Sequence, residues 1–175
     1  EKYIVERGFS EGWVKPAPPE NRTGKTIAVI GSGPAGLAAA QQLNRAGHTV
    51  TVFERDNKFG GLLRYGIPDF KMEKNVIDRR LEVLKAEGII FKCNTEIGNT
   101  VSAEELESEF DAIVLCTGAS VKRQLPIPGA DLKGVVQAMD FLPHNNKAVD
   151  EQHDREEKYL AKDKNVIVIG GGDTG

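Results

Sequence analysis

Four short apolar runs recur along the first two thirds of the chain, and each is rich in β-branched or aliphatic residues. Runs of this length, bounded by polar or glycine-containing stretches, are typical of strands buried on both faces of a parallel sheet. We therefore predict strands at Thr26–Ile30, Thr49–Phe53, Ile89–Cys93 and Asp111–Cys116.

Helix-favouring segments lie between and after these runs. Leu37–Ala46 is rich in Ala, Leu and Gln, and a glycine follows it where a helix would end. Lys74–Ala86 places its apolar residues on one helical stripe. Ser102 and Glu105 have the spacing of a capping box, and a further short helix is expected over Val136–Leu142. Because strands and helices alternate, the predicted fold class is α/β, with a Rossmann-like central parallel sheet.

The segments outside this alternation are predicted to connect rather than to fold. Residues 1–23 include the Pro-rich stretch Lys15–Pro19 and are expected to form an extended linker, with Trp13 anchored on the body of the fold. Residues 145–164 are strongly charged and are expected to form a solvated connector. Residues 165–169 repeat the apolar pattern of the first strand.

A glycine motif, Gly31-Ser-Gly-Pro-Ala-Gly36, stands between the first predicted strand and the helix that follows it. In such a turn Gly31 permits the tight bend, Gly33 lets the backbone approach a pyrophosphate, and Gly36 lets the helix pack closely on the strand. The N–H groups and the dipole at the start of the helix favour a bound phosphate. This context, rather than the glycine spacing alone, predicts a dinucleotide site.

An acidic residue closes the second predicted strand: Glu54 lies 18 residues after Gly36. Its carboxylate is expected to accept hydrogen bonds from the hydroxyls of a ribose. A carboxylate here disfavours a 2′-phosphate and hence NADP, although the neighbouring Arg55 argues the other way.

The glycine spacing returns after the last apolar run, in Gly170-Gly-Gly-Asp-Thr-Gly175. Two nucleotide sites in one polypeptide are typical of a flavoprotein that holds one cofactor and takes hydride from an exchanging nicotinamide. The choice between NADH and NADPH cannot be made from these residues, because the specificity position of a second domain would lie beyond Gly175.

Composition narrows the possibilities further. The 175 residues carry a net charge of −3 without a dense basic stripe, which argues against nucleic acid as a partner. No apolar run approaches the roughly 20 residues that span a bilayer, so we expect no membrane association and a cytoplasmic location. The two cysteines, Cys93 and Cys116, are too few for a metal or iron–sulfur site and do not form a CxxC pair. His48, His144 and His153 show no ligand spacing and are expected at the surface.

Longer strings resemble a known family. The stretches GSGPAGLAAAQQLNRAGHTVTVFER, GGLLRYGIPDFKMEK, TGA and VIVIGGGDTG are similar to the FAD- and NAD(P)H-binding small subunit of glutamate synthase. The upstream EGWVKPAPPENRTGK resembles the segment between the iron–sulfur and flavin domains of that family. The resemblance covers nearly the whole chain.

The resemblance implies FAD at the first motif and NADPH or NADH at the second. The implied contacts with the FAD pyrophosphate are Gly31, Gly33, Pro34, Ala35 and Gly36, and those with the adenosine are Glu54 beside Arg55 at the ribose and Ile97 near adenine. Along the flavin the resemblance implies Gly61, Leu62 and Arg64, with Thr117, Gly118 and Ala119 closing over the cofactor. The implied contacts with the nicotinamide nucleotide are Gly170, Gly172, Asp173, Thr174 and Gly175. Two of these have a plain alternative: Arg64 as a surface salt-bridge residue and Ile97 as ordinary core.

The resemblance also implies an organisation and a function. It divides the chain into a linker that follows an iron–sulfur domain (1–23), an FAD-binding domain (24–144), a connector (145–164) and the first strand of a truncated NAD(P)H-binding Rossmann domain (165–175). In the family, electrons pass from the nicotinamide to FAD and through iron–sulfur clusters to a large subunit, which forms glutamate from 2-oxoglutarate and glutamine. A segment that returns to the flavin domain at the end of the family's chains is absent here. We therefore expect this chain alone to hold FAD weakly or not at all and to have no glutamate synthase activity.

Other functions remain open at this stage. The flavin domain of dihydropyrimidine dehydrogenase and ferredoxin–NADP reductase-like subunits share parts of the pattern, and a non-catalytic nucleotide-binding fragment is a third candidate. A disulfide reductase would need a cysteine pair after the glycines of the flavin loop, where GGLLRYGIPDFK has none. A monooxygenase or amine oxidase shares the first motif and Glu54 but not GGLLRYGIP. No catalytic acid or base is expected, because hydride transfer depends mainly on how the two rings are placed.

Overall fold

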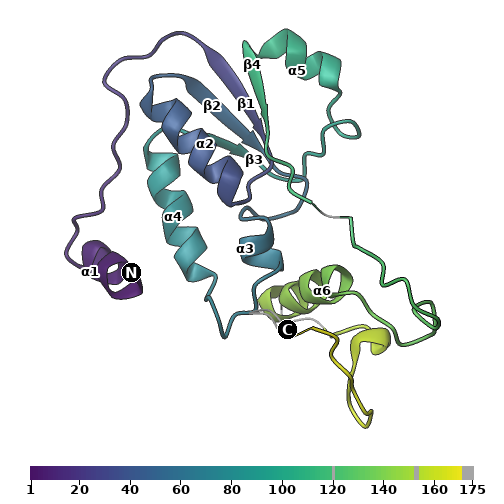
Figure 1. Cartoon of the computed structure of the whole chain (residues 1–175). Helices are drawn as coiled ribbons and strands as arrows, with labels where there is room; N and C mark the ends of the chain where they lie inside the picture. Colours follow the sequence, from purple (N-terminus) through teal and green to yellow (C-terminus); the bar gives the residue numbers. More distant parts are fainter. Residues whose placement is uncertain (120, 152–153, 171–175) are drawn as a thin grey trace.

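A four-stranded parallel sheet forms the centre of the chain. The structure, a computed structural model, describes residues 1–119, 121–151 and 154–170. The sheet order is β3-β2-β1-β4, so β1 lies between β2 and β4 (Figure 1). The strands are β1 (Thr26–Ile30), β2 (Thr49–Phe53), β3 (Ile90–Lys92) and β4 (Ala112–Leu115). The α/β class and all four strands in this part of the sequence are thereby confirmed.

Alternate residues of the strands enter two apolar clusters on opposite faces of the sheet. On one face Val29, Val50 and Val52 pack with α2 (Pro34–Arg45) and α4 (Asn75–Ala86), whose Leu37 and Leu84 are buried. On the other face, Ala28, Ile30 and Phe53 pack with Leu106 of α5 (Ala103–Glu109). The core is therefore built around the two central strands, whose residues are buried on both faces.

The helix boundaries follow the capping signals in the sequence. Pro34 occupies the first turn of α2, and Gly47, just beyond the end of this helix, has a φ of +96°. The predicted capping box at α5 is present: Ser102 Oγ accepts from Glu105 N, and the Glu105 carboxylate accepts from Ser102 N.

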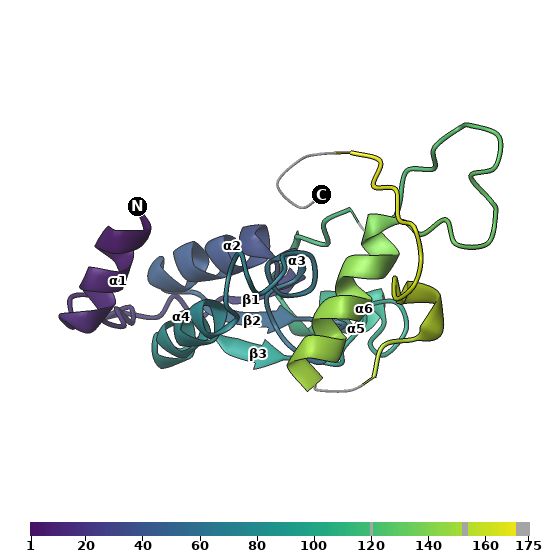
Figure 2. The same ribbon diagram turned by 90° about the horizontal axis from the view of Figure 1, so that it is seen from below.

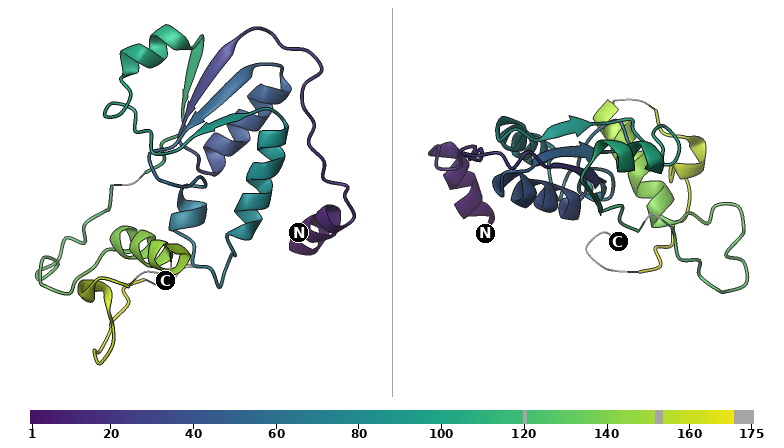
Figure 3. Two further views of the ribbon diagram at one scale, coloured as in Figure 1. Left: turned by 180° about the vertical axis from the view of Figure 1, so that it is seen from behind. Right: turned by 90° about the horizontal axis from the view of Figure 1, so that it is seen from above.

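The N-terminal segment differs from the predicted linker. Residues Lys2–Ser10 form α1, which stands apart from the sheet and is joined to β1 by a long extended stretch (Figures 1 and 3). The helix is fixed by Arg79 of α4, whose two terminal nitrogens donate to the Glu6 carboxylate at 2.6 and 2.7 Å and whose guanidinium lies 4.1 Å from the centre of the Phe9 ring. The expectation that Trp13 anchors this segment is wrong, because its side chain is 69% exposed.

The segment expected as a solvated connector begins inside a helix. Helix α6 runs over Ala138–Glu151, with Pro143 in its interior, and is longer than the short helix predicted from Val136. Asn146 and Ala148 are buried against the body of the fold, and α6 contacts α3 (Leu62–Tyr65), as Figure 2 also shows. His144 belongs to this helix and is half-buried, with its ring 4.3 Å from that of Tyr159, so the expectation of a surface position is wrong for this residue.

The last apolar run does not form the predicted strand. Residues 165–169 are exposed and irregular, and they follow the single turn Glu157–Tyr159. An extended segment needs a neighbouring strand to take its backbone hydrogen bonds, and within the described residues this run has none. Gly170 is exposed with a φ of +123°, while Gly172, Asp173, Thr174, Gly175 and His153 lie outside the described residues.

Candidate nucleotide-binding site

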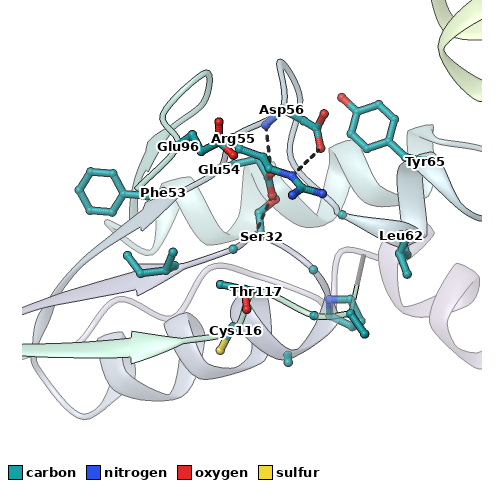
Figure 4. Close-up of a pocket in the computed structure, with 18 of the residues that line it drawn as sticks. Ser32, Phe53, Glu54, Arg55, Asp56, Leu62, Tyr65, Glu96, Cys116 and Thr117 are labelled. Carbon is teal, nitrogen blue, oxygen red and sulfur yellow. Dashed lines mark hydrogen bonds and ion pairs between the residues drawn. The ribbon is translucent and has the colours of Figure 1, made fainter. Parts of the chain in front are cut away.

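A cavity of about 740 Å³ opens at the carboxyl ends of β1, β2 and β4. Its walls come from the turn after β1, the loops after β2 and β3 and the segment after β4 (Figure 4), together with one side of α6. In open α/β sheets ligands bind at this edge, where the strand order reverses on either side of the first strand. The position therefore follows from topology, and the side chains decide what can bind there.

The glycines of the turn after β1 have distinct steric roles. A Cβ at Gly31, whose φ is +103°, would lie 2.4 Å from the carbonyl oxygen of Cys116, and one at Gly36 would lie 1.9 Å from the carbonyl oxygen of Gly31. A Cβ at Gly33 would meet no atom within 4 Å. Gly31 and Gly36 thus permit close packing of the turn, whereas Gly33 leaves open space in the cavity wall.

The first turn of α2 faces this open space. Gly33 is its N-cap, Pro34 is its first helical residue, and no side chain caps it. Gly33, Pro34 and Ala35 all line the cavity. Uncapped N–H groups at a helix N-terminus, together with the helix dipole, form a site that favours an anion such as a phosphate.

Glu54 is held rigidly at the end of β2. Its side chain is 6% exposed and lines the cavity. Oε2 accepts hydrogen bonds from the backbone N–H of Ser32, at 3.0 Å, and from Ser32 Oγ, while Oε1 accepts from Asp56 N at 3.1 Å. The carboxylate is thus fixed in place, with part of its acceptor capacity directed to its protein neighbours.

Opposite charges meet at the rim beside Glu54. Asp56 lies 3.9 Å from Arg55 Nε and 3.1 Å from Lys147 Nζ of α6, and all three residues line the cavity.

Tyr65 donates from its hydroxyl to Asn57 Oδ1 at 2.7 Å. Burial, followed by the nearby Asp56 charge, raises the pKa of Tyr65 above its usual value, so its hydroxyl remains protonated.

The loop at Gly60 and Gly61, called the flavin loop because the resemblance implies a flavin contact there, packs directly on the glycine turn. A Cβ at Gly61, whose φ is +51°, would come within 2.9 Å of Gly33 Cα. Gly60 N donates to Ser32 Oγ at 2.9 Å. Two sequence motifs some 28 residues apart therefore form one continuous wall of the cavity.

Comparison with known proteins places the chain in a family. The sequence model of the pyridine nucleotide-disulphide oxidoreductases matches residues 25–175. The chain belongs to this family. Its two cysteines, Cys93 and Cys116, are free thiols.

Curated relatives confirm the more specific resemblance. The chain is 56% identical to a glutamate synthase [NADPH] small chain of Mycobacterium tuberculosis over 98% of its own length and 36% of the relative's. It is 53% identical to the corresponding Bacillus subtilis protein, over all of this chain and 36% of the relative. The chain thus spans about a third of the length of these relatives.

A solved structure shares the fold. Mycobacterium tuberculosis FprA, determined in complex with NADPH, superposes with a TM-score of 0.64 at 30% sequence identity. The superposition covers 70% of this chain and 29% of FprA.

The structure brings most of the predicted site residues of this oxidoreductase fold together around the cavity. Those that line it are Gly31, Gly33, Pro34, Ala35, Glu54, Arg55, Gly61, Leu62, Ile97, Thr117, Gly118 and Ala119. Gly36 lies behind the wall, where it sets the packing of α2. Arg64 does not line the cavity: its side chain is 3% exposed, donates to the carbonyl oxygen of Phe59 at 2.7 Å and pairs with Asp78. Of its alternative as a surface salt-bridge residue, the ion pair is therefore present, whereas the surface position is wrong.

Sequence reasoning missed several residues that line this site, among them Ser32, Asp56, Tyr65 and Lys147. Ser32 lay inside the glycine motif, and its small polar side chain beside an expected ribose acid was an available signal. Lys147 carried no local signal, because it lies 91 residues from its partner Asp56.

Two classes of feature are absent from the described part of the chain. No group of three or more His, Cys, Asp or Glu side chains there is arranged to hold a metal ion. Within the same residues, no helix has both the length and the apolar character needed to cross a membrane.

Proposed function

We propose that the cavity binds FAD, with its pyrophosphate at the glycine turn. The observation that carries this proposal is the open space at Gly33 in front of the uncapped N-terminus of α2. A pyrophosphate placed there would receive backbone hydrogen bonds and the favourable end of the helix dipole. Glu54, at the end of the neighbouring strand, stands where an adenosine ribose is expected relative to such a turn.

The remaining walls suit the rest of the cofactor. Ile97 and Phe53 supply apolar surface on the ribose side for adenine, while Gly61, Leu62 and the segment Thr117–Ala119 would lie along the flavin half. When bound, FAD would supply the redox chemistry, taking a hydride from a reduced nicotinamide and releasing electrons. The residues of this chain would orient the cofactor and exclude water around it. Tyr65, whose hydroxyl is protonated, would contribute a neutral wall rather than a proton acceptor.

The relatives' names, together with the family resemblance of the sequence, support a proposal for the whole protein. In the whole protein, this domain would receive hydride from NADPH or NADH bound at the second glycine motif, which begins at Gly170. Electrons would pass through iron–sulfur clusters outside this chain to a glutamate synthase large subunit, for glutamate formation from glutamine and 2-oxoglutarate. The chain alone, which spans about a third of its relatives, would not form glutamate.

The direct test is the visible absorption spectrum of the purified chain, followed by denaturation and identification of any released nucleotide. Because the chain alone is expected to hold FAD weakly, we expect a flavin spectrum after addition of FAD, and FAD as the released compound. Gly33→Val serves as the site variant, because the added side chain would enter open space and valine suits the extended backbone that precedes Pro34. This variant should remain folded by circular dichroism and lose FAD.

The alternatives give different results. Equal FAD binding by the wild-type chain and Gly33→Val would overturn the assignment of the pyrophosphate to this turn. A folded wild-type chain that takes up neither FAD nor any other adenine dinucleotide would overturn the assignment of this cavity to FAD. Glutamate formation by the isolated chain would contradict the proposed division of labour.

A further inference from the structure

We infer that Ser32 is a positioning residue that sets the Glu54 carboxylate for the adenosine ribose and locks the flavin loop onto the glycine turn. The inference rests on the proposed function and adds a residue to it. Ser32 is fully buried, with no exposed surface, and lies on the cavity wall between Gly31 and Gly33. Figure 4 shows its side chain directed at Glu54.

The hydroxyl of Ser32 connects the turn after β1 to two positions that lie 22 and 28 residues further along the chain. Its Oγ accepts from Gly60 N at 2.9 Å. A serine hydroxyl has a single hydrogen, and the Gly60 N–H already occupies one of its acceptor directions, so this hydrogen is donated to Glu54 Oε2. The turn after β1, the end of β2 and the flavin loop thus meet at one buried oxygen.

The contact between Ser32 and Glu54 limits how the Glu54 carboxylate can bind a ribose hydroxyl. The two oxygens of a carboxylate offer about four acceptor directions in total. Ser32 N, Ser32 Oγ and Asp56 N occupy three of them, with both Ser32 donors on Oε2. The capacity left lies on Oε1, so Ser32 determines which carboxylate oxygen is presented to a ribose hydroxyl.

The contact between Ser32 and Gly60 also fixes the flavin loop, which would lie along the flavin half of the cofactor. Gly61 packs so closely on Gly33 that a Cβ would reach within 2.9 Å of its Cα. The adjacent Gly60 N–H is held by Ser32 Oγ and is buried. Without the hydroxyl, this donor would have no hydrogen-bond partner in the wall, and the loop would lose its fixed distance from the turn.

The test compares Ser32→Ala with wild type by titration of two ligands. FAD reports on the whole site, whereas ADP shares only the adenosine and the pyrophosphate. We expect Ser32→Ala to weaken both ligands, FAD by about tenfold, as is typical when one charge-assisted hydrogen bond is lost. The matched control is Ser102→Ala, which removes a serine hydroxyl from the exposed cap of α5 and should lower the melting temperature without changing either affinity.

A double-mutant cycle with Glu54→Ala separates positioning from general loosening of the fold. If Ser32 acts through Glu54, the double variant should bind ADP no more weakly than Glu54→Ala alone. Additive losses, unchanged affinities in Ser32→Ala, or a loss confined to FAD would overturn the inference. Failure of the wild-type chain to bind FAD while it binds ADP would instead defeat the flavin proposal, and the ADP cycle would still decide the role of Ser32. Binding of neither ligand would overturn both.

Discussion

Lys147 Nζ lies 3.1 Å from Asp56 Oδ1, and this contact joins residues 91 positions apart in the sequence. It ties α6 to the loop after β2 at the rim of the nucleotide cavity. A second ion pair, Lys58 with Asp150, lies between the same two segments. The charges of this helix are therefore directed at the cavity rim and not only at solvent.

The first prediction concerns the anchoring of α6. Asn146 is 4% exposed and donates to the carbonyl oxygens of Arg64 and Ile67 at 3.1 and 3.0 Å. Asn146→Ala should lower the free energy of unfolding by about 1–3 kcal/mol, because the Arg64 carbonyl loses its side-chain donor and the Ile67 carbonyl keeps only that of Lys74 Nζ. Lys147→Ala removes a partly exposed ion pair and should cost less than about 1 kcal/mol. Chemical denaturation measures both, and a larger loss in Lys147→Ala would contradict this account.

The second prediction concerns the packing of α2 on the sheet. Gly36→Ala would place a methyl group 1.9 Å from the carbonyl oxygen of Gly31, an atom of the backbone that cannot move without disturbing the turn. We expect a loss of about 3 kcal/mol in unfolding free energy, or failure to accumulate folded protein. Gly33→Ala is the matched control, since its methyl group meets open space. Similar thermal stability of the two variants would show that the turn is not tightly packed.

The third prediction concerns the extended N-terminal stretch. Glu87 is fully buried and accepts from Ala17 N at 3.2 Å and from Gln41 Nε2 at 3.0 Å, and it pairs with Arg45. Burial acts to raise the pKa of Glu87, but the hydrogen bonds from Arg45, Gln41 and Ala17 N outweigh it, and the net pKa is lowered.

Glu87→Ala should therefore cost about 1–3 kcal/mol and release the stretch around Ala17 to limited proteolysis. Glu107→Ala, at an exposed position of α5, is the control and should leave the cleavage rate unchanged. Protection of the N-terminal stretch in Glu87→Ala would mean that other contacts hold it.

The fourth prediction concerns acid stability. Asp111 accepts hydrogen bonds from Lys25 Nζ at 2.7 Å and from Thr26 N at 2.8 Å. These contacts, of which that with Lys25 has the larger effect, lower the pKa of Asp111 to about 2. Because the folded-state pKa is below the ordinary value, the stabilisation is present above about pH 4 and is lost as the pH falls toward 2.

Asp111→Asn should thus be less stable than wild type at pH 7, and the two unfolding curves should converge between about pH 4 and pH 2. Thermal melts over this range provide the measurement. The exposed Asp131→Asn is the control, for which no such convergence is expected. A stability difference between Asp111→Asn and wild type that stays constant down to pH 2 would contradict the assigned pKa.

Much of the fold follows from local sequence patterns. The strands, the start of α2 and the capping box of α5 were predictable because each depends on residues close together in the chain, such as Ser102 and Glu105. The glycine turn and Glu54 were predictable for the same reason, since the strand–turn–helix–strand unit places them at one edge of the sheet. Helix α1 and the second half of α6 were not predictable from local patterns, because their charged residues pair with distant parts of the chain. Glu6 of α1 pairs with Arg79, and Lys147 of α6 pairs with Asp56 in the loop after β2.

The sequence by itself determined the fold class, the family and the position of the candidate nucleotide site at the ends of the central strands. Tertiary structure decided which side chains form that site. It turned Arg64 away from the cavity into an ion pair with Asp78, and it brought Lys147 to the rim. It also buried Ser32 between Glu54 and Gly60, where one hydroxyl donates to the Glu54 carboxylate and accepts from the Gly60 N–H. The physical reason is that a buried polar group needs a hydrogen-bond partner, and the chain supplies those partners from segments that meet only in the folded state.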